Sequence, residues 1–119
     1  MAKIMVVDDA AFMRMMVKNA LAQGGYTDVC EASDGNEAVQ MYTEQQPQLV
    51  LMDITMPVMN GYEATSEIRK FSATVPIIGL TARAFSDDEQ EGYDCGMTEY
   101  MTKPINIVQL RMHISKLLG

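Results

Sequence analysis

The feature that most constrains the fold of this chain is a regular alternation of short segments with strand-like composition and longer segments with helical spacing. Five segments have the length of a β-strand: Ile4–Val7, Val29–Ala32, Leu49–Met52, Ile77–Leu80 and Glu99–Met101. The third of these is apolar throughout, as a strand covered on both faces should be. Strands that alternate with helices are typical of parallel sheets, because each parallel connection needs a crossover. The sequence therefore predicts five βα units.

Helix start and stop signals fall between these strands. We expect five helices: a first that stops near Gly24–Gly25, a second that starts at Asp34 and closes before Pro47, a third that starts near Asn60–Gly61, a fourth from Ser86 to Gly96 and a fifth after Asn106. Asp34 and Ser86 are each followed by a glutamate three residues later, which is the spacing of a capping box. Glycine commonly follows the last turn of a helix.

Apolar positions predict which side of two helices faces the sheet. In the first helix they are Phe12, Met13, Met16, Val17, Ala20 and Leu21, and in the last helix they are Val108, Leu110, Ile114 and Leu117. Spacings of three and four residues bring such side chains onto one stripe of a helix. We therefore expect both stripes to pack against the sheet.

The number and order of these elements predict the fold class. A chain of 119 residues can bury one continuous core and leaves little room for a second module. Five βα units close naturally into a doubly wound α/β sandwich, (βα)5, of the flavodoxin-like kind. We expect five parallel strands in the order 2-1-3-4-5, with helices on both faces. Residues 1–119 should form a single domain.

Composition and charge exclude several classes of protein. The chain is 48% apolar and 21% charged, which is ordinary for a globular protein. Its net charge is −7 and its nine basic residues are scattered, which argues against binding to nucleic acid. Met1–Lys3 lead directly into the first apolar segment, so we expect no signal peptide, no membrane span and a cytoplasmic location. Cys30 and Cys95 lack metal or redox spacing and are expected to be reduced thiols.

Residues that can carry chemistry follow four of the five predicted strands. Asp8 and Asp9 come after the first strand, Asp53 after the third, Thr81 after the fourth and Lys103 after the fifth. In open parallel sheets, reactive groups gather beyond the carboxyl ends of the strands where strand order reverses, here between the first and third strands. We therefore expect these side chains to converge on one edge of the sheet.

The predicted acidic group needs a positive partner. Carboxylates brought within several ångströms repel one another by roughly a few kcal/mol per close pair at an effective dielectric constant of about 20. Lys103 is one candidate partner, and a hard divalent cation such as Mg2+ is the other. Alternatively, Asp9 only caps the helix that starts at Ala10 or Ala11. Capping alone would not predict the joint occurrence of acids, a hydroxyl and a lysine at separate strand ends.

Four motifs, in this order, resemble the receiver domain of two-component response regulators. They are Val6-Val7-Asp8-Asp9, Asp53-Ile54-Thr55-Met56-Pro57 with Gly61, Leu80-Thr81-Ala82, and Lys103-Pro104. Each motif is short, but their order and spacing together are specific and cover nearly the whole chain. The segments from Asp8 to Arg14 and from Asp53 to Gly61 are particularly similar to small chemotaxis regulators of the CheY type. The segment Thr81–Ala84 is also similar to receivers attached to hybrid kinases.

The resemblance implies a phosphorylation site and assigns its residues. Asp53 would be the phosphoacceptor, and it would attack the phosphorus of a phosphohistidine donor. The implied ligands of Mg2+ (or Mn2+) are Asp8, Asp9, Asp53 and the backbone carbonyl of Thr55, and the implied contacts of the phosphoryl group are Thr81, Ala82 and Lys103.

The resemblance also implies a switch and its partners. Thr81 would move toward the phosphoryl group and leave space into which Tyr100 turns. A downstream protein would read this change on the face made by the fourth helix, fifth strand and fifth helix, as a shift between states already in equilibrium. A sensor histidine kinase would be the phosphodonor. The chain would be a monomeric signalling protein that assists its own phosphorylation and dephosphorylation, and not an enzyme with a separate substrate.

Other functions stay open at this stage. The chain can be the receiver of another phosphorelay or of a hybrid kinase. A phosphohydrolase of the haloacid-dehalogenase type also has an Asp nucleophile after a strand, but a second acid would stand where this chain has Thr55. An FMN carrier shares the predicted topology, but Asp8 and Asp9 would repel the flavin phosphate. A scaffolding protein without phosphorylation is the remaining alternative.

Overall fold

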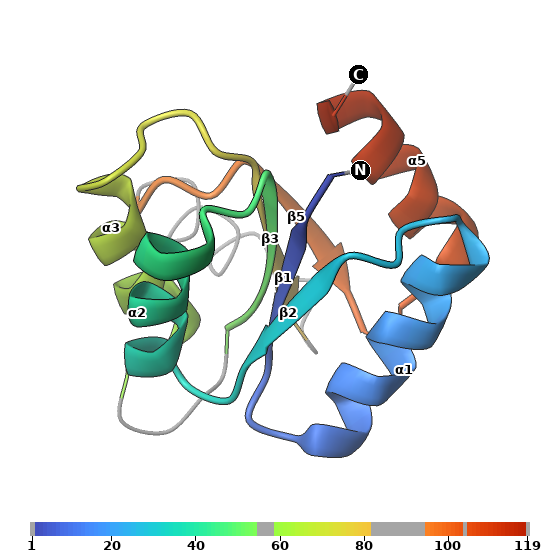
Figure 1. The fold of residues 1–119 in the computed structure, drawn as a ribbon, viewed down its shortest axis with the longest axis horizontal. Helices are drawn as coiled ribbons and strands as arrows, with labels where there is room; N and C mark the ends of the chain where they lie inside the picture. Colours follow the sequence, from blue (N-terminus) through green and yellow to red (C-terminus); the bar gives the residue numbers. More distant parts are fainter. Residues whose placement is uncertain (1, 55–58, 82–94, 104, 119) are drawn as a thin grey trace.

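The sheet has the predicted topology. A computed structural model describes residues 2–54, 59–81, 95–103 and 105–118, and in it five parallel strands lie in the order β2-β1-β3-β4-β5 (Figure 1). The strands are β1 Ile4–Val7, β2 Val29–Ala32, β3 Leu49–Asp53, β4 Ile77–Thr81 and β5 Glu99–Thr102. The expected order is confirmed, and β3, β4 and β5 each extend one residue beyond the range expected from the sequence.

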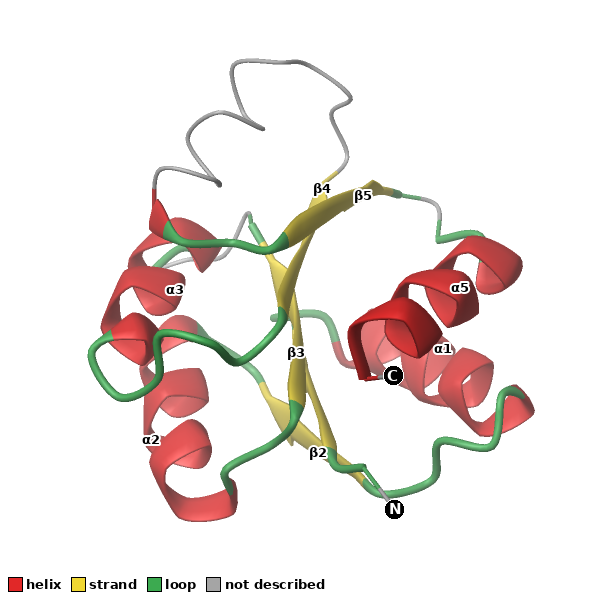
Figure 2. Ribbon diagram, turned by 90° about the horizontal axis from the view of Figure 1, so that it is seen from above, coloured by secondary structure: helices red, strands yellow, loops and turns green. Residues whose placement is uncertain are grey.

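Helices cover both faces of the sheet. Helices α1 (Ala11–Gln23) and α5 (Ile107–Leu118) lie on one face, and α2 (Gly35–Gln45) and α3 (Gly61–Arg69) lie on the other (Figure 2). This placement follows from right-handed crossovers that run in both directions from β1. The fourth helix, expected from Ser86 to Gly96, falls mostly outside the described residues. No helix in the described part of the chain is long and apolar enough to cross a membrane.

The central strands contribute to two separate cores. Successive side chains of a strand point to opposite faces of the sheet. Ile4 and Val6 of β1 therefore pack with residues of α1 and α5, whereas Met5 and Val7 pack with residues of α2 and α3. β3 alternates in the same way. Burial on both faces explains why these two strands are apolar up to the aspartate that closes β3.

Side-chain caps start three helices at the positions that the sequence indicated. Asp34, Asn60 and Asn106 each accept a hydrogen bond from the backbone N–H three residues later, at 2.7, 2.9 and 3.1 Å. Such a cap typically contributes about 1 kcal/mol, because it satisfies a donor that the helix leaves without a partner. The predicted starts of α2, α3 and α5 are therefore confirmed.

The predicted apolar stripes of α1 and α5 are wrong at three positions. Phe12 and Met16 are 65% and 47% exposed, and Val108 is 59% exposed. The buried residues are Val17, Ala20 and Leu21 in α1 and Leu110 and Ile114 in α5. Phe12 and Val108 stand in the first turns of helices that begin beyond the carboxyl ends of β1 and β5, and Met16 lies about one turn further along α1 than Phe12. Helical spacing identifies an apolar stripe, but it does not tell how far along the helix the sheet extends.

Candidate functional site

The sheet brings the residues expected at four strand ends to its carboxyl edge. β1 and β3 are paired up to their last apolar residues, so Asp8 and Asp53 lie next to each other. β4 and β5 are also paired at their ends, which brings Thr81 and Lys103 to the same edge. Strand order reverses between β1 and β3. This is the position at which open α/β sheets bind ligands.

Lys103 joins the two buried carboxylates directly. Its Nζ lies 3.2 Å from Oδ2 of Asp8 and 3.0 Å from Oδ1 of Asp53. Asp8 and Asp53 are only 3% and 4% exposed, so the ammonium group offsets negative charge that water hardly screens. Burial by itself would lower the pKa of Lys103, but the hydrogen bonds and charges of Asp53 and Asp8 outweigh burial and raise this pKa above its ordinary 10.5. Lys103 is therefore charged at neutral pH.

Asp9 completes an acidic group with the two buried aspartates. One carboxylate oxygen from each of Asp8, Asp9 and Asp53 lies within 4.8 Å of the others. Asp9 is exposed, unlike the other two. Hard divalent cations prefer oxygen ligands, and they keep several water molecules when only a few carboxylates bind them. Two buried carboxylates and one exposed carboxylate therefore fit such a cation and leave one side open to water or to a substrate.

The alternative interpretation of Asp9 as a helix cap is wrong. The N-cap residue of α1 is Ala10, and no side-chain hydrogen bond caps this end of the helix. It is Asp8 that contacts the helix start, because its Oδ1 accepts a hydrogen bond of 2.9 Å from the N–H of Ala10. The structure thus places the Asp9 carboxylate with the acidic group.

Two residues expected to take part in a switch lie on β4 and β5, the strands that end at Thr81 and lead to Lys103. Thr81 closes β4 and is 5% exposed. Tyr100 of β5 is partly buried, and its hydroxyl donates a hydrogen bond of 2.9 Å to the hydroxyl of Tyr62 on α3. No motif in the sequence indicates a role for Tyr62. The two residues are 38 positions apart in the chain, and no local pattern indicates that they meet.

Two expected site residues, Thr55 and Ala82, lie outside the described residues. Conversely, Arg14 contacts the site although no individual role for it is predicted from the sequence. Its guanidinium donates a hydrogen bond of 2.7 Å to the backbone carbonyl of Asp8 and pairs with Glu31 of β2. Arginine in a helix is common, so its presence six residues after an aspartate is no signal for such a contact.

Gly61 is required where α3 starts against the backbone of the site. A Cβ atom on Gly61 would lie 2.3 Å from the carbonyl oxygen of Asp53 and 2.8 Å from Cα of Ile54. Gly61→Ala should displace the end of β3 and lower the free energy of unfolding by about 1–3 kcal/mol, as overpacking usually does. Urea unfolding measures the loss, and amide NMR shifts of Asp53 and Ile54 report the displacement.

Gly79→Ala is the matched control for this substitution. Its added Cβ would also meet a close neighbour, but that neighbour is Sδ of Met97, which belongs to a flexible side chain. We expect a smaller loss of stability than for Gly61→Ala and an undisturbed Asp53. Equal losses in the two variants would show that the backbone contact at Gly61 has no special cost.

The fold and the site together define a class, the doubly wound α/β proteins with an acidic group at the reversal of strand order. Comparison with known families narrows this class. The family model of the response regulator receiver domain matches residues 4–115. The chain therefore belongs to the receiver domain family of two-component signalling systems.

Relatives of known name agree with this assignment. The chain is 40% identical over 117 residues to the chemotaxis protein CheY of Bacillus subtilis, with 98% of each chain covered. It is 39% identical over 117 residues to the chemotaxis protein CheY of Thermotoga maritima, with 96% of this chain and 98% of the relative covered. It is also 37% identical over 114 residues to the sensor protein EvgS of Escherichia coli, which covers 96% of this chain but only 9% of EvgS.

Solved structures show the same fold. The chemotaxis protein CheY4 of Vibrio cholerae has a TM-score of 0.92 and 34% identity, with 98% of each chain covered. The receiver domain of the sensor histidine kinase PA1611 of Pseudomonas aeruginosa has a TM-score of 0.91 and 33% identity, with 99% of this chain and 98% of that domain covered. The PA1611 structure has a magnesium ion coordinated in its active site cleft.

Proposed function

We propose that this chain is a phosphorylation-dependent switch in which Asp53 accepts a phosphoryl group from a histidine kinase. The observation that carries the proposal is the meeting of Asp8, Asp9, Asp53 and Lys103 at one edge of the sheet. Membership of the receiver domain family supports it, since receiver domains accept phosphate from histidine kinases. In this proposal residues 1–119 work as one receiver domain.

Mg2+, or Mn2+ in its place, is the proposed cofactor. Asp9 would bind the ion directly, Asp8 would bind it directly or through water, and Asp53 and the backbone carbonyl of Thr55 would complete the protein ligands. The close approach of the three carboxylates supports this set, as does the magnesium ion in the PA1611 receiver. A divalent ion held by these residues would neutralise charge that develops on the phosphoryl oxygens.

The side chains of this protein perform the transfer. A carboxylate oxygen of Asp53 attacks phosphorus, an O–P bond forms, and the bond from phosphorus to the histidine nitrogen of the donor breaks. Lys103, already beside this carboxylate, then pairs with a phosphoryl oxygen. Thr81 donates its hydroxyl to another oxygen, and Ala82 offers room and a backbone N–H. Positioning and charge neutralisation supply most of the acceleration in such transfers.

The proposed output follows from the movement of Thr81 and Tyr100. Their rearrangement would be read by a downstream protein on the face of the fourth helix, β5 and α5. The described part of this face has a groove of about 580 Å3 between β5 and α5, lined by residues that include Tyr100, Met112 and His113. Met112 is 66% exposed. Val108, one helical turn before Met112 on α5, is 59% exposed, and two neighbouring exposed apolar side chains on this face support a protein partner.

A chemotaxis role of the CheY type is the particular function that we propose. Two relatives matched over 98% of their length are chemotaxis proteins. A receiver that works in another phosphorelay or with a hybrid kinase is the second candidate, which the similarity to EvgS and to the PA1611 receiver favours. Rates of transfer from purified phosphorylated kinases of both kinds distinguish the candidates, because the cognate donor should transfer fastest.

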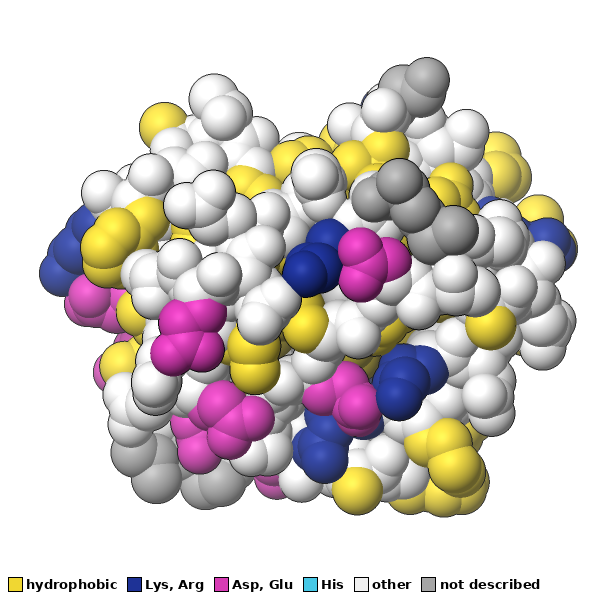
Figure 3. All heavy atoms as spheres, viewed as in Figure 1, with side chains coloured by type: hydrophobic (Ala, Val, Ile, Leu, Met, Phe, Trp, Pro, Cys, Tyr) yellow, Lys and Arg dark blue, Asp and Glu magenta, His cyan; other side chains and the backbone are white. Residues whose placement is uncertain are grey.

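Charge and surface complete the proposal. On the face shown in Figure 3, basic side chains are interspersed with acidic ones, and the net charge is −7. Both features support a function without nucleic acid. We further propose that the protein is a cytoplasmic monomer and that it assists its own phosphorylation and dephosphorylation without acting as an enzyme on other substrates. Sustained hydrolysis of an added phosphate ester would favour the phosphohydrolase instead.

Intact mass spectrometry with a small phosphodonor tests the proposed function. With acetyl phosphate and Mg2+, the chain should gain the mass of one phosphoryl group. The gain should disappear in EDTA and return when Mg2+ or Mn2+ is added in excess. An unchanged mass in the presence of Mg2+ would overturn the proposal and favour a scaffold that is not phosphorylated.

A further inference from the structure

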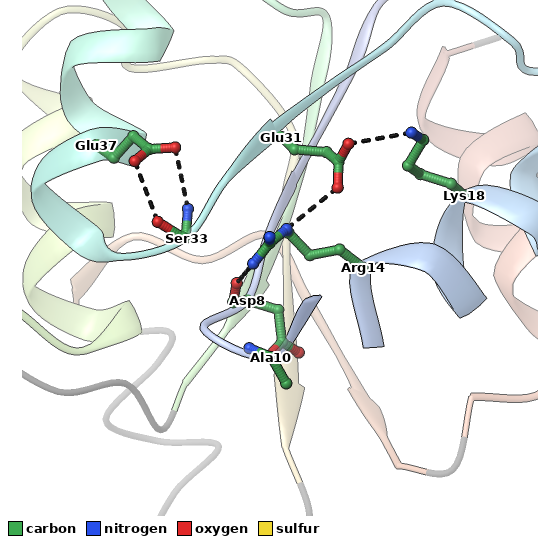
Figure 4. Close-up of polar contacts among 7 residues, drawn as sticks. All are labelled: Asp8, Ala10, Arg14, Lys18, Glu31, Ser33 and Glu37. Atoms are coloured by element: carbon green, nitrogen blue, oxygen red, sulfur yellow. Dashed lines mark hydrogen bonds and ion pairs between the residues drawn. The ribbon is translucent and has the colours of Figure 1, made fainter. Parts of the chain in front are cut away.

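Arg14 connects the acidic group to the neighbouring strand β2 (Figure 4). Its Nη1 donates a hydrogen bond of 2.7 Å to the backbone carbonyl of Asp8, and its Nε donates one of 3.1 Å to Oε1 of Glu31. The side chain of Arg14 is only 17% exposed. A planar guanidinium can hold two acceptors in a fixed relation to each other, which a lysine ammonium cannot do. Arg14 therefore ties a loop carbonyl to a strand carboxylate.

This contact means that both polar groups of the Asp8 backbone are held against β2. The N–H of Asp8 donates to the carbonyl of Ala32 at 3.1 Å, and the carbonyl of Asp8 is held from Glu31 through Arg14. The same planar peptide unit contains the carbonyl of Asp8 and the N–H and Cα of Asp9. Fixing that carbonyl therefore limits the directions in which the Asp9 side chain can point.

Lys18 offers a contrast on the same carboxylate. Its Nζ pairs with Oε2 of Glu31 at 3.0 Å, one helical turn further from Asp8, and its side chain is 43% exposed. The hydrogen bond from Lys18 is the largest cause that holds the pKa of Glu31 below its ordinary value, and the bond from Arg14 acts in the same direction. Glu31 is therefore ionised at neutral pH and anchors both cations, of which Arg14 is the one that bonds the Asp8 carbonyl.

We infer that Arg14 is a positioning residue for the metal site. By holding the carbonyl of Asp8 beside Glu31, it orients the Asp8–Asp9 peptide so that the Asp9 carboxylate lies with those of Asp8 and Asp53, where the cation would bind. The inference rests on the proposed function, since it concerns the site that would bind Mg2+. Arg14 touches neither the cation nor the phosphoryl group. Hydrogen bonds that orient metal ligands in this way contribute to metal affinity without contacting the metal.

The test compares Mg2+ binding in two variants by isothermal titration calorimetry. Arg14→Met keeps an apolar stem of similar shape and removes both hydrogen bonds. Its Mg2+ dissociation constant should rise about tenfold, the lower end of the cost of losing an outer hydrogen-bond partner. Lys18→Met removes a cation from the same carboxylate and should leave the dissociation constant nearly unchanged. Arg14→Lys should be as stable to urea as the wild type but should bind Mg2+ more weakly, because an ammonium group cannot hold both the Asp8 carbonyl and the Glu31 carboxylate.

A second measurement reports on the loop in the absence of metal. The N–H of Ala10 is hydrogen-bonded to Asp8, so its hydrogen exchange by NMR follows the order of this loop. Exchange should be faster in Arg14→Met than in the wild type and unchanged in Lys18→Met. In addition, Glu31→Gln should weaken Mg2+ binding in the wild type but add little in Arg14→Met, because the two residues act as one unit.

The outcomes separate this inference from the proposed function. A wild-type chain that binds no Mg2+ would overturn the proposed function and this inference with it. A wild type that binds Mg2+ while Arg14→Met and Lys18→Met have equal affinities would overturn the inference alone. If Arg14→Met does not fold, the Mg2+ affinity of Arg14→Lys is compared with that of the wild type instead. An affinity of Arg14→Lys equal to that of the wild type would contradict the inference.

Discussion

Asp53→Asn should take up no phosphoryl group under conditions in which the wild type is fully phosphorylated. The amide has nearly the shape of the carboxylate, and its oxygen can still accept a hydrogen bond from Lys103, but it lacks the charge and nucleophilicity that the reaction needs. The intact mass of Asp53→Asn, measured after incubation with acetyl phosphate and Mg2+, should show no added phosphoryl group.

The free energy of unfolding of Asp53→Asn tells whether a loss of phosphorylation comes from the missing carboxylate or from a folding defect. In EDTA, Asp53→Asn should be at least as stable as the wild type, because it removes one of three carboxylates that repel one another. Asp28→Asn changes an exposed aspartate in the same way and should be phosphorylated normally. A normal mass gain in Asp53→Asn would place the acceptor elsewhere. Borohydride reduction of the wild-type acyl phosphate, followed by peptide mapping, would then locate it.

Lys103→Met should produce the largest loss of stability among the substitutions considered. The variant leaves the buried carboxylates of Asp8 and Asp53 without the ammonium group that lies 3.2 and 3.0 Å from them. Removing the cation from a buried ionic cluster costs about 3 kcal/mol or more, because the remaining negative charges are poorly solvated and have lost the positive charge that offset them. Urea unfolding in EDTA measures this loss. Some phosphorylation should remain, since Asp53 is still present. The conformational response to phosphorylation should be weaker than in the wild type.

The loss should depend on Mg2+ and on pH in a defined way. Mg2+ should stabilise Lys103→Met more than it stabilises the wild type, because the cation replaces the missing positive charge. The folded-state pKa of Lys103 is raised above 10.5. The stability that Lys103 contributes is therefore fully present below the unfolded-state pKa and is lost as the pH rises through the folded-state value. The difference in free energy of unfolding between Lys103→Met and the wild type should thus be constant around neutral pH and shrink only in strongly alkaline solution.

An exposed lysine provides the control for this variant. Lys70 pairs with Glu67, but their side chains are 67% and 40% exposed. Lys70→Met should change the free energy of unfolding by no more than about 1 kcal/mol, as is usual for surface ion pairs. Equal stability of Lys103→Met and the wild type in EDTA would show that the carboxylates do not depend on this lysine.

Particular residues show why much of the fold was predictable. Asp34 and Asn60 cap their helices within three residues of sequence, so a local pattern was sufficient to find them. β3 is buried on both faces and is therefore apolar up to Asp53. The alternation of strands and helices indicated a parallel sheet, and the strand order was predicted as one that is common for five βα units. The residues at the strand ends could then be assigned to one edge of the sheet.

Other residues show where local patterns were insufficient. Phe12 and Val108 have the spacing of buried residues but are exposed, because burial depends on how far the sheet extends beneath each helix. The contacts of Arg14 with Asp8 and Glu31, and of Tyr62 with Tyr100, join side chains whose types alone predict nothing in particular. Only packing brings such residues together.

The amino-acid sequence by itself determined the elements, their order and the acids and the lysine at the strand ends, because periodicity, capping and connectivity are properties of the chain. The tertiary structure decided which charges meet. Lys103 reaches Asp8 although 95 positions separate them, and Asp9 joins the acidic group instead of capping α1. The physical reason is that electrostatic interactions depend on distance and burial in three dimensions, and both are set only when the strands pair and the helices cover them.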